Sequence, residues 1–184
     1  MTGLYAASGW CTALPDAPYF QGLGPITEVR GVSDNAIVLG LGDTVYLWQD
    51  GLATPLPLPS GQSVIPTAIS ADGTAIVGSI RLDEWREAFR WTEATGFQPL
   101  GRLGIGSYGS SASGVSGDGS VIVGRSQTGD DLLTPFRWAD GTMTPLSGGS
   151  DAVDVSLDGS VIAGYRAGAF FTAESVTWTG GAPL

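Results

Sequence analysis

The chain has 184 residues, 29 of them glycine and only 14% charged, a composition that favours one folded domain over a disordered chain. Its 18 carboxylates outnumber 8 basic residues, so a net charge of −10 argues against nucleic acid or anionic membranes as partners. With no histidine and one cysteine, Cys11, the chain cannot hold a disulfide framework, a His-ligated metal or a His-based catalytic triad, and we expect no cofactor.

Residues 1–30 resemble part of the repeat described below. The segment FQGLG at Phe20–Gly24 parallels FQPLG at Phe97–Gly101, and Trp10 precedes the first as Trp91 precedes the second. We interpret 1–30 as the outer half of a repeat unit, whose strand around Phe20 closes the fold by pairing with the last unit. No export signal is visible in residues 1–25, and no apolar run is long enough for a membrane span.

The rest of the chain repeats one pattern four times, at approximately 31–66, 67–112, 113–152 and 153–184. AISADGTAIVG at 68–78 recurs as GVSGDGSVIVG at 114–124 and DVSLDGSVIAG at 154–164, and GVSDNAIVLG at 31–40 is one residue shorter. The Asp-Gly pairs that begin at Asp72, Asp118 and Asp158 predict hairpin turns, because glycine tolerates positive φ and the aspartate side chain binds nearby amides.

A strand that ends in tryptophan follows each of these segments. The four tryptophans are 43, 47 and 40 residues apart, and we expect them to occupy equivalent core positions: Trp48, Trp91, Trp138 and Trp178. In FRW at 89–91 and 136–138, the two-residue period of a strand directs the aromatic rings to the core. Arg90 and Arg137 then lie on the opposite face, where we expect structural contacts between units or pairs with acids.

Units of about 40–45 residues with about four strands are typical of the blades of a β-propeller. We therefore predict an all-β, single-domain β-propeller of about four four-stranded blades with almost no helix. Two arrangements remain open: a closed four-bladed ring, and an open arc that pairs with another copy to make eight blades. The residues expected to be buried are Ile37, Val38, Ile76, Val77, Ile122, Val123 and Ile162.

The order of these elements, VSxDGSVIVG, then FRW, then Pro-Leu, resembles the bacterial extracellular repeats of the HAF family over residues 31–184. The first unit lacks the Asp-Gly and Phe-Arg parts, and the last has VTW at 176–178, as terminal repeats often depart from the pattern. The resemblance implies a secreted or surface propeller and supplies no catalytic residues.

Carboxylates are the plentiful reactive groups, and they could form two kinds of site. A glycosidase would need a carboxylate pair among residues such as Glu87, Glu93 and Glu174. A calcium site would use Asp130 and Asp131, or Asp151 and Asp154. Neither aspartate pair has the spacing of a calcium-binding loop, the regular aspartates are explained by turns, and Cys11 has no histidine to activate it. We predict that the protein is not an enzyme and holds no metal.

Aromatic residues outside the repeated positions are the candidate binding residues, because tyrosine and tryptophan are enriched at interfaces. They are Trp85, Tyr108, Tyr5 and Tyr19. We select Trp85 and Tyr108, and note that the units differ most at 81–87 and 128–133.

These observations predict a non-catalytic structural or interaction module. Its expected setting is the surface of a virus particle or bacterial cell, where it contacts protein subunits or copies of itself. A lectin-like carbohydrate-binding propeller is the alternative, and a carboxylate-based glycoside-active enzyme is the third reading.

Overall fold

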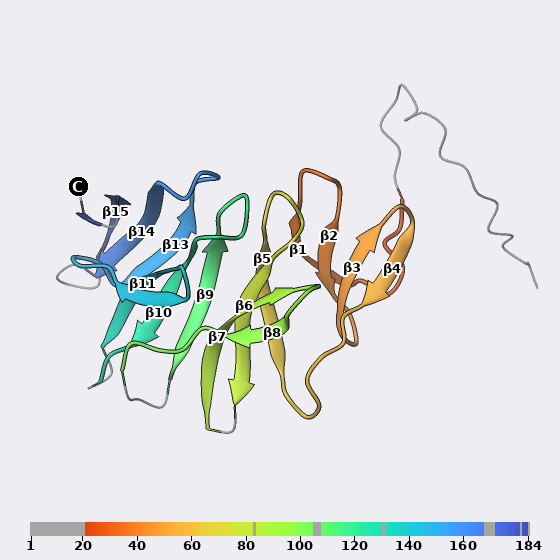
Figure 1. The fold of residues 1–184 in the computed structure, drawn as a ribbon, viewed down its shortest axis with the longest axis horizontal. Coiled ribbons are helices and arrows are strands. Elements are labelled where there is room, and N and C mark those ends of the chain that lie inside the picture. Colours follow the sequence, from red (N-terminus) through yellow and green to blue (C-terminus); the bar gives the residue numbers. More distant parts are fainter. Residues whose placement is uncertain are drawn as a thin grey trace, which may run out of the picture.

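The structure is a computed structural model that describes residues 21–184 except 83, 105–107, 130–131, 168–171, 181 and 184. Its strands form four antiparallel sheets of four strands each, and every sheet uses strands that are consecutive in the chain. We call these sheets blades 1 to 4. Figure 1 shows them side by side in chain order, from blade 1 in orange to blade 4 in blue. The prediction of an all-β propeller of four four-stranded blades is confirmed.

Each blade is a simple up-and-down meander of neighbouring strands. The described residues contain no helix, and accordingly none that could cross a membrane. Blade 1 contains β1 (Glu28–Val32), β2 (Val38–Leu41), β3 (Val45–Gln49) and β4 (Leu52–Pro55); blade 2 contains β5 (Val64–Ile69), β6 (Ile76–Leu82), β7 (Trp85–Thr92) and β8 (Gly96–Pro99); blade 3 contains β9 (Ser110–Val115), β10 (Ile122–Gln127), β11 (Leu133–Ala139) and β12 (Thr142–Pro145); blade 4 contains β13 (Asp151–Val155), β14 (Val161–Ala167), β15 (Ala173–Thr179) and β16 (Ala182–Pro183).

The repeated SxDG segment forms the turn between the first two strands of a blade. In blade 3, the Ser116 hydroxyl donates to Asp118 Oδ1 (2.8 Å), which also accepts from the amide (2.9 Å) and hydroxyl (2.7 Å) of Ser120. The Val121 amide donates back to Ser116 Oγ (2.9 Å), and Gly119 sits at φ 69°, where glycine carries no steric penalty. The same bonds recur in blades 2 and 4, which confirms the predicted turns.

Hydrogen bonds to the ionised carboxylate lower its pKa. The Ser120 amide and hydroxyl and the Ser116 hydroxyl hold the pKa of Asp118 at about 2, and the equivalent bonds from Ser156 and Ser160 hold that of Asp158 at about 2. Burial raises the pKa of Asp72 but is outweighed by its bonds from Ser70 and Thr74, so the net shift is downward. These aspartates are therefore charged turn residues.

Blade 1 builds the same turn with one residue fewer. Asn35 replaces the aspartate and accepts from the Ser33 hydroxyl, and the Ile37 amide donates to Ser33 Oγ (3.0 Å). Ala36 stands where the other blades have glycine, at φ 63°, a conformation that costs an L-residue about 1–2 kcal/mol.

The hydrophobic cores lie between neighbouring blades. Alternate residues of the second strand in each blade point to opposite neighbours. Leu39, Val77 and Val123 contact the following blade, and we call the face that carries them the forward face. Ile76, Ile122 and Ile162 contact the preceding blade, and we call theirs the rear face. Three blade–blade contacts thus produce three cores.

The four repeated tryptophans occupy one register position on the rear face. They pair with Val38, Ile76, Ile122 and Ile162 on the neighbouring strand, as the predicted equivalence requires. Their burial differs because the neighbours differ: Trp178 is 0% and Trp91 8% exposed, whereas Trp48 and Trp138 are half-buried.

Five of the residues predicted to be buried are buried, and two are not. Ile76, Val77, Ile122, Val123 and Ile162 are at most 1% exposed. For Ile37 and Val38 the prediction is wrong, because both are half-buried. Val38 lies on the rear face of blade 1, which no described blade covers, and Ile37 lines an open groove between blades 1 and 2.

The blades form an open row, as Figure 1 shows. Within the described residues, strong strand contacts join blade 1 to 2, 2 to 3 and 3 to 4, but none joins blade 4 to blade 1. Residues 21–24 belong to no strand, and blade 4 has its own fourth strand, so the predicted pairing of this segment with the last unit is not seen within one chain. Residues 1–20, including Trp10 and Phe20, lie outside the described residues. Each blade begins a few residues before the expected start of its repeat.

Candidate binding surface at the loop edge

The two predicted binding residues lie on neighbouring blades at the edge opposite the SxDG turns. Trp85 is the first residue of β7 in blade 2, and Tyr108 precedes β9 in blade 3. A parallel bridge between Arg86 and Gly109, the residues that follow them in the chain, holds the two segments together. An added Cβ on Gly109 would lie 1.7 Å from the Arg86 carbonyl oxygen, so this close approach requires glycine.

Tyr108 belongs to a hydrogen-bonded cluster that joins blades 3 and 4. Arg125 in β10 donates from Nη2 to the Tyr108 hydroxyl (2.7 Å) and from Nη1 to Asp151 Oδ2 (3.0 Å). The Tyr165 hydroxyl donates to the same carboxylate oxygen (3.2 Å). The Arg125 guanidinium also lies 5.4 Å from the centre of the Tyr108 ring, within cation–π range. We call Tyr108, Arg125, Asp151 and Tyr165 the arginine cluster.

The cluster is part buried and part exposed. Asp151 is 7% exposed, whereas Tyr108 and Tyr165 are 39% and 37% exposed. Burial raises the pKa of Asp151, and Arg125 and Tyr165 partly offset that shift by stabilising the carboxylate. The pKa of Tyr165 is also raised, by burial and by the charge of Asp151. The partly buried ion pair thus fixes Arg125, and the two tyrosine rings present a polar aromatic surface to solvent.

Trp85 is half-buried beneath an arginine. The Arg102 guanidinium lies 4.3 Å from the centre of the indole ring, and the Trp85 indole nitrogen is buried without a hydrogen-bond partner. Next to Arg102, the Gly101 carbonyl accepts a hydrogen bond from the Ser110 hydroxyl (2.6 Å), which joins this segment to the start of β9. Trp85 therefore adds to the same edge a cation–π pair next to the arginine cluster.

The remaining predicted residues take other places. Arg90 Nε donates to the Gly119 carbonyl of blade 3 (3.1 Å), which is the expected contact between blades, and Arg137 is half-buried at the equivalent register position. Tyr5, Cys11, Tyr19, Asp130 and Asp131 lie outside the described residues.

The carboxylates weighed as catalytic or metal-binding groups are dispersed. Glu87 in blade 2 accepts from the Gly101 amide (2.9 Å), Glu174 pairs with Arg166 within blade 4, and Glu93 is exposed. Asp151 binds Arg125, while Asp154 is exposed and is separated from Asp151 by a β-bulge in β13. Across the described part of the chain, no three acidic or cysteine side chains converge as a metal site would require.

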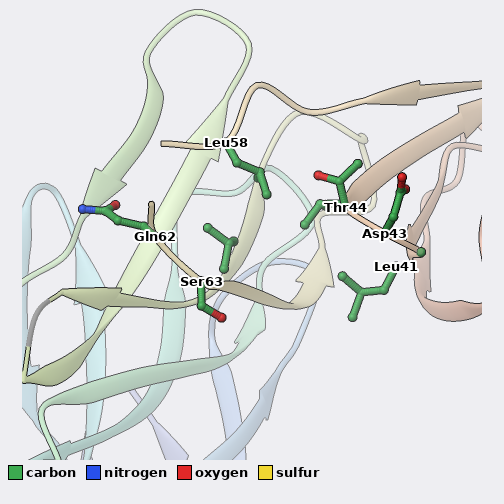
Figure 2. Close-up of a pocket in the computed structure, with 9 residues that line it drawn as sticks. Leu41, Asp43, Thr44, Leu58, Gln62 and Ser63 are labelled. Atoms are coloured by element: carbon green, nitrogen blue, oxygen red, sulfur yellow. The ribbon is translucent and has the colours of Figure 1, made fainter. Parts of the chain in front are cut away.

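Two hollows lie beside blade 1. The larger is the open groove between blades 1 and 2, about 1330 Å³ in volume, lined by a mixture of polar and apolar residues that includes Ile37, Asp72, Arg90 and Trp91. The smaller is about 280 Å³ and lies between the β2–β3 connection and the segment before β5 (Figure 2). Its lining includes Asp43, Thr44, Leu58 and Gln62, a mixture of polar and apolar groups without a charged pair.

Sequence reasoning missed Arg125, Tyr165 and Arg102 as members of the surface. A departure from the repeat carried the signal for two of them: the residue after the repeated glycine is Ser79 in blade 2 but Arg125 in blade 3 and Tyr165 in blade 4. Residues that depart from a repeat are where function is added to a shared scaffold.

No protein-family model and no curated protein matches this chain. Solved structures do match. TolB from Acinetobacter baumannii is 17% identical at a TM-score of 0.62, and the match covers 84% of this chain and 41% of that one. A structure assigned to TolB of Agrobacterium tumefaciens is 16% identical at a TM-score of 0.61, and the match covers 83% of this chain and 57% of that one. The chain thus spans less than two thirds of either protein, and at this identity the likeness is one of fold: the blades are arranged as in TolB-type structures.

Proposed function

We propose that this chain is a non-catalytic interaction module that binds other protein subunits through the edge formed by the arginine cluster and Trp85. The observation that carries the proposal is that tyrosine, tryptophan and arginine, the residue types that dominate binding energy at protein interfaces, meet there around one partly buried ion pair. Because Asp151 holds Arg125 in place, the surface is pre-organised and little conformational entropy is lost on binding.

The setting expected from the sequence, a virus particle or bacterial cell surface, is part of this proposal. It rests on the resemblance to HAF repeats and on the low content of charged residues. Quantitative proteomics of purified particles and of cell-surface fractions from the native source tests it. Enrichment in either fraction supports the setting, and recovery only with cytoplasmic proteins contradicts it.

The binding surface is tested by affinity capture from the native source, repeated with each purified partner. The double variant Trp85→Ala and Tyr108→Ala is compared with the wild type and with Leu52→Ala, which alters a 67% exposed side chain on blade 1. We expect the double variant to lose at least tenfold in affinity, with an almost unchanged unfolding midpoint, and the control to bind normally. Equal binding by all three proteins contradicts the proposed surface.

Carbohydrate recognition is the second candidate, and the groove between blades 1 and 2 favours it. Trp91 lines this groove, and its indole nitrogen is buried without an acceptor. Sugar sites combine an aromatic ring with a few polar groups that fix orientation. A glycan array decides between the candidates: binding that is lost in Trp91→Phe but kept in the Trp85 and Tyr108 double variant supports this reading. Hydrolysis of any glycan that a single Glu→Gln change abolishes overturns the non-catalytic proposal.

A further inference from the structure

The two end faces of the row expose the side chains that the inner blades bury. On the rear face, Ile69, Val115 and Val155 are at most 9% exposed, but the equivalent Val32 of blade 1 is 65% exposed. On the forward face, Val121 is 6% exposed, but the equivalent Val161 of blade 4 is 39% exposed. Blade 4 also exposes Val153, Leu157 and Tyr165, and blade 1 exposes Val29. Both ends are therefore unfinished copies of an interface that the chain makes three times.

One contact recurs at each inner interface with the same geometry. The residue after the SxDG turn packs over the turn of the following blade. A Cβ added to Gly73 would lie 2.8 Å from Ile37 Cδ1, and a Cβ added to Gly159 would lie 2.7 Å from Val121 Cγ2. Val161 is the fourth such residue, and no described residue receives it.

The turns are also joined by backbone hydrogen bonds between blades. The Asp34 amide donates to the Ala71 carbonyl of blade 2 (2.7 Å), and the Gly117 amide of blade 3 donates to the Leu157 carbonyl of blade 4 (2.9 Å). Within the described residues, the Leu157 amide donates to no backbone carbonyl, and the Asp34 carbonyl receives no such bond. Among the described residues, the row thus ends in a turn amide and a turn carbonyl that make no backbone hydrogen bond to another blade.

We propose that the forward face of blade 4 binds the rear face of blade 1 in a second copy of this chain. This proposal deepens the proposed function, because it names the chain itself as one of the protein subunits bound. The contact is head to tail, and two copies close into a ring if the rotation permits. Such a ring has eight blades, the upper end of the usual range for propellers.

One pair at the proposed contact differs from its inner counterpart, and a charged pair favours it. In the interface between blades 3 and 4, an added Cβ on Gly114 would lie 2.9 Å from Asp154 Cα, so the forward-face residue of that pair must lack a side chain. The equivalent pair between copies is Asp154 on the forward face and Gly31 on the rear face, so the Asp154 side chain must be accommodated beside the Gly31 backbone. Beside Gly31 lies Arg30, whose Nη2 pairs with Glu28 (3.0 Å) and whose Nε is buried without a partner; in the proposed contact this guanidinium faces the exposed Asp154 carboxylate.

One residue loosens the contact between copies relative to the inner ones. Val161 meets Ala36 of the second copy, where the inner blades present glycine, so the methyl group must be accommodated by the shorter turn of blade 1. We therefore expect Ala36→Gly to strengthen association without being required for it.

The test is the mass of the purified chain in solution, measured by light scattering after size exclusion over a series of concentrations. We expect a species of twice the 18.8 kDa chain mass. Val161→Asp damages only the forward face of blade 4, and Val32→Asp only the rear face of blade 1, so each variant alone should be monomeric. Mixing the two variants should restore a dimer, because one chain keeps an intact rear face and the other an intact forward face. Leu132→Asp, at a residue 66% exposed on neither end face, should leave the dimer intact.

Each alternative outcome is distinct. A wild-type chain that stays monomeric at all concentrations overturns the proposal. A dimer that Val161→Asp abolishes and Val32→Asp leaves unchanged, with no rescue on mixing, shows two blade 4 faces in contact and overturns the head-to-tail arrangement. Higher oligomers that both variants dissolve support the contact but exclude closure by two copies. The double variant Trp85→Ala and Tyr108→Ala should keep the dimer mass, so failure of the proposed binding surface is separable from failure of this contact.

Discussion

Two tryptophans at the same register position should respond oppositely to the same substitution. Trp178 is 0% exposed and its indole nitrogen donates to the Ser147 carbonyl of the preceding blade (2.8 Å). Trp91 is 8% exposed and its indole nitrogen is buried without an acceptor. Replacing either by phenylalanine removes the indole N–H and part of the ring. The two changes therefore differ mainly in what happens to one hydrogen-bond donor.

The expected magnitudes follow from volume and hydrogen bonding. Each change empties roughly 40 Å³, which at about 24 cal/mol per Å³ costs about 1 kcal/mol. Trp178→Phe also loses a hydrogen bond with a net value of about 1 kcal/mol, so its cost is about 2 kcal/mol. Trp91→Phe instead removes a buried, unsatisfied donor whose burial costs about 1–3 kcal/mol, so its net effect lies between zero and a stabilisation of about 2 kcal/mol.

Urea unfolding followed by far-ultraviolet circular dichroism measures both changes without relying on tryptophan fluorescence. The dependence of unfolding free energy on urea must stay unchanged, because a changed slope signals an altered unfolding reaction. We expect the two free energies of unfolding to differ by about 2 kcal/mol or more. Equal destabilisation by both variants would show that Trp91 does hydrogen-bond in solution, and the comparison of the two blade contacts would be wrong.

Two further pairs of changes test the turns. Gly119→Ala places a methyl group 2.5 Å from the Ala75 Cβ of the preceding blade, whereas Gly141→Ala, also at positive φ, meets nothing within 4 Å. In thermal melts, Gly141→Ala should lose about 1–2 kcal/mol of stability from backbone strain alone. Gly119→Ala should lose about 1–3 kcal/mol more, because its methyl group also overpacks the contact between blades. Equal losses contradict the close packing of turns between blades. Asp118 and Asp158 have a pKa of about 2 in the folded chain against an ordinary pKa of 3.8 for an aspartate, so they stabilise the fold above about pH 4 and this contribution disappears as pH falls towards 2. The double variant Asp118→Asn and Asp158→Asn should lose less stability than the wild type between pH 4 and 2 in the same melts, and parallel acid curves contradict the assignment.

The repeated parts of the fold could be predicted from the sequence because their contacts are local. The SxDG turn is specified within six residues, and the strand after it alternates towards two neighbours, so Ile122 and Val123 could both be placed in cores. Burial of Val38 could not be judged, since it depends on whether a blade lies behind blade 1. Arg125 and Asp151 are 26 residues apart on different blades, and only the packing of those blades brings them together.

Because every core lies between two blades, no blade has a hydrophobic interior of its own. The chain should therefore behave as a one-dimensional array whose stability is a sum over nearest-neighbour junctions. In a single chain, blades 2 and 3 each take part in two junctions and the outer blades in one, so in a monomeric variant such as Val161→Asp amide hydrogen exchange should be slowest in the middle of the row and fastest at its ends. Because each blade packs only against its neighbours, the number of blades is easy to change in evolution. Duplicating an inner blade adds one complete junction and creates no new kind of surface.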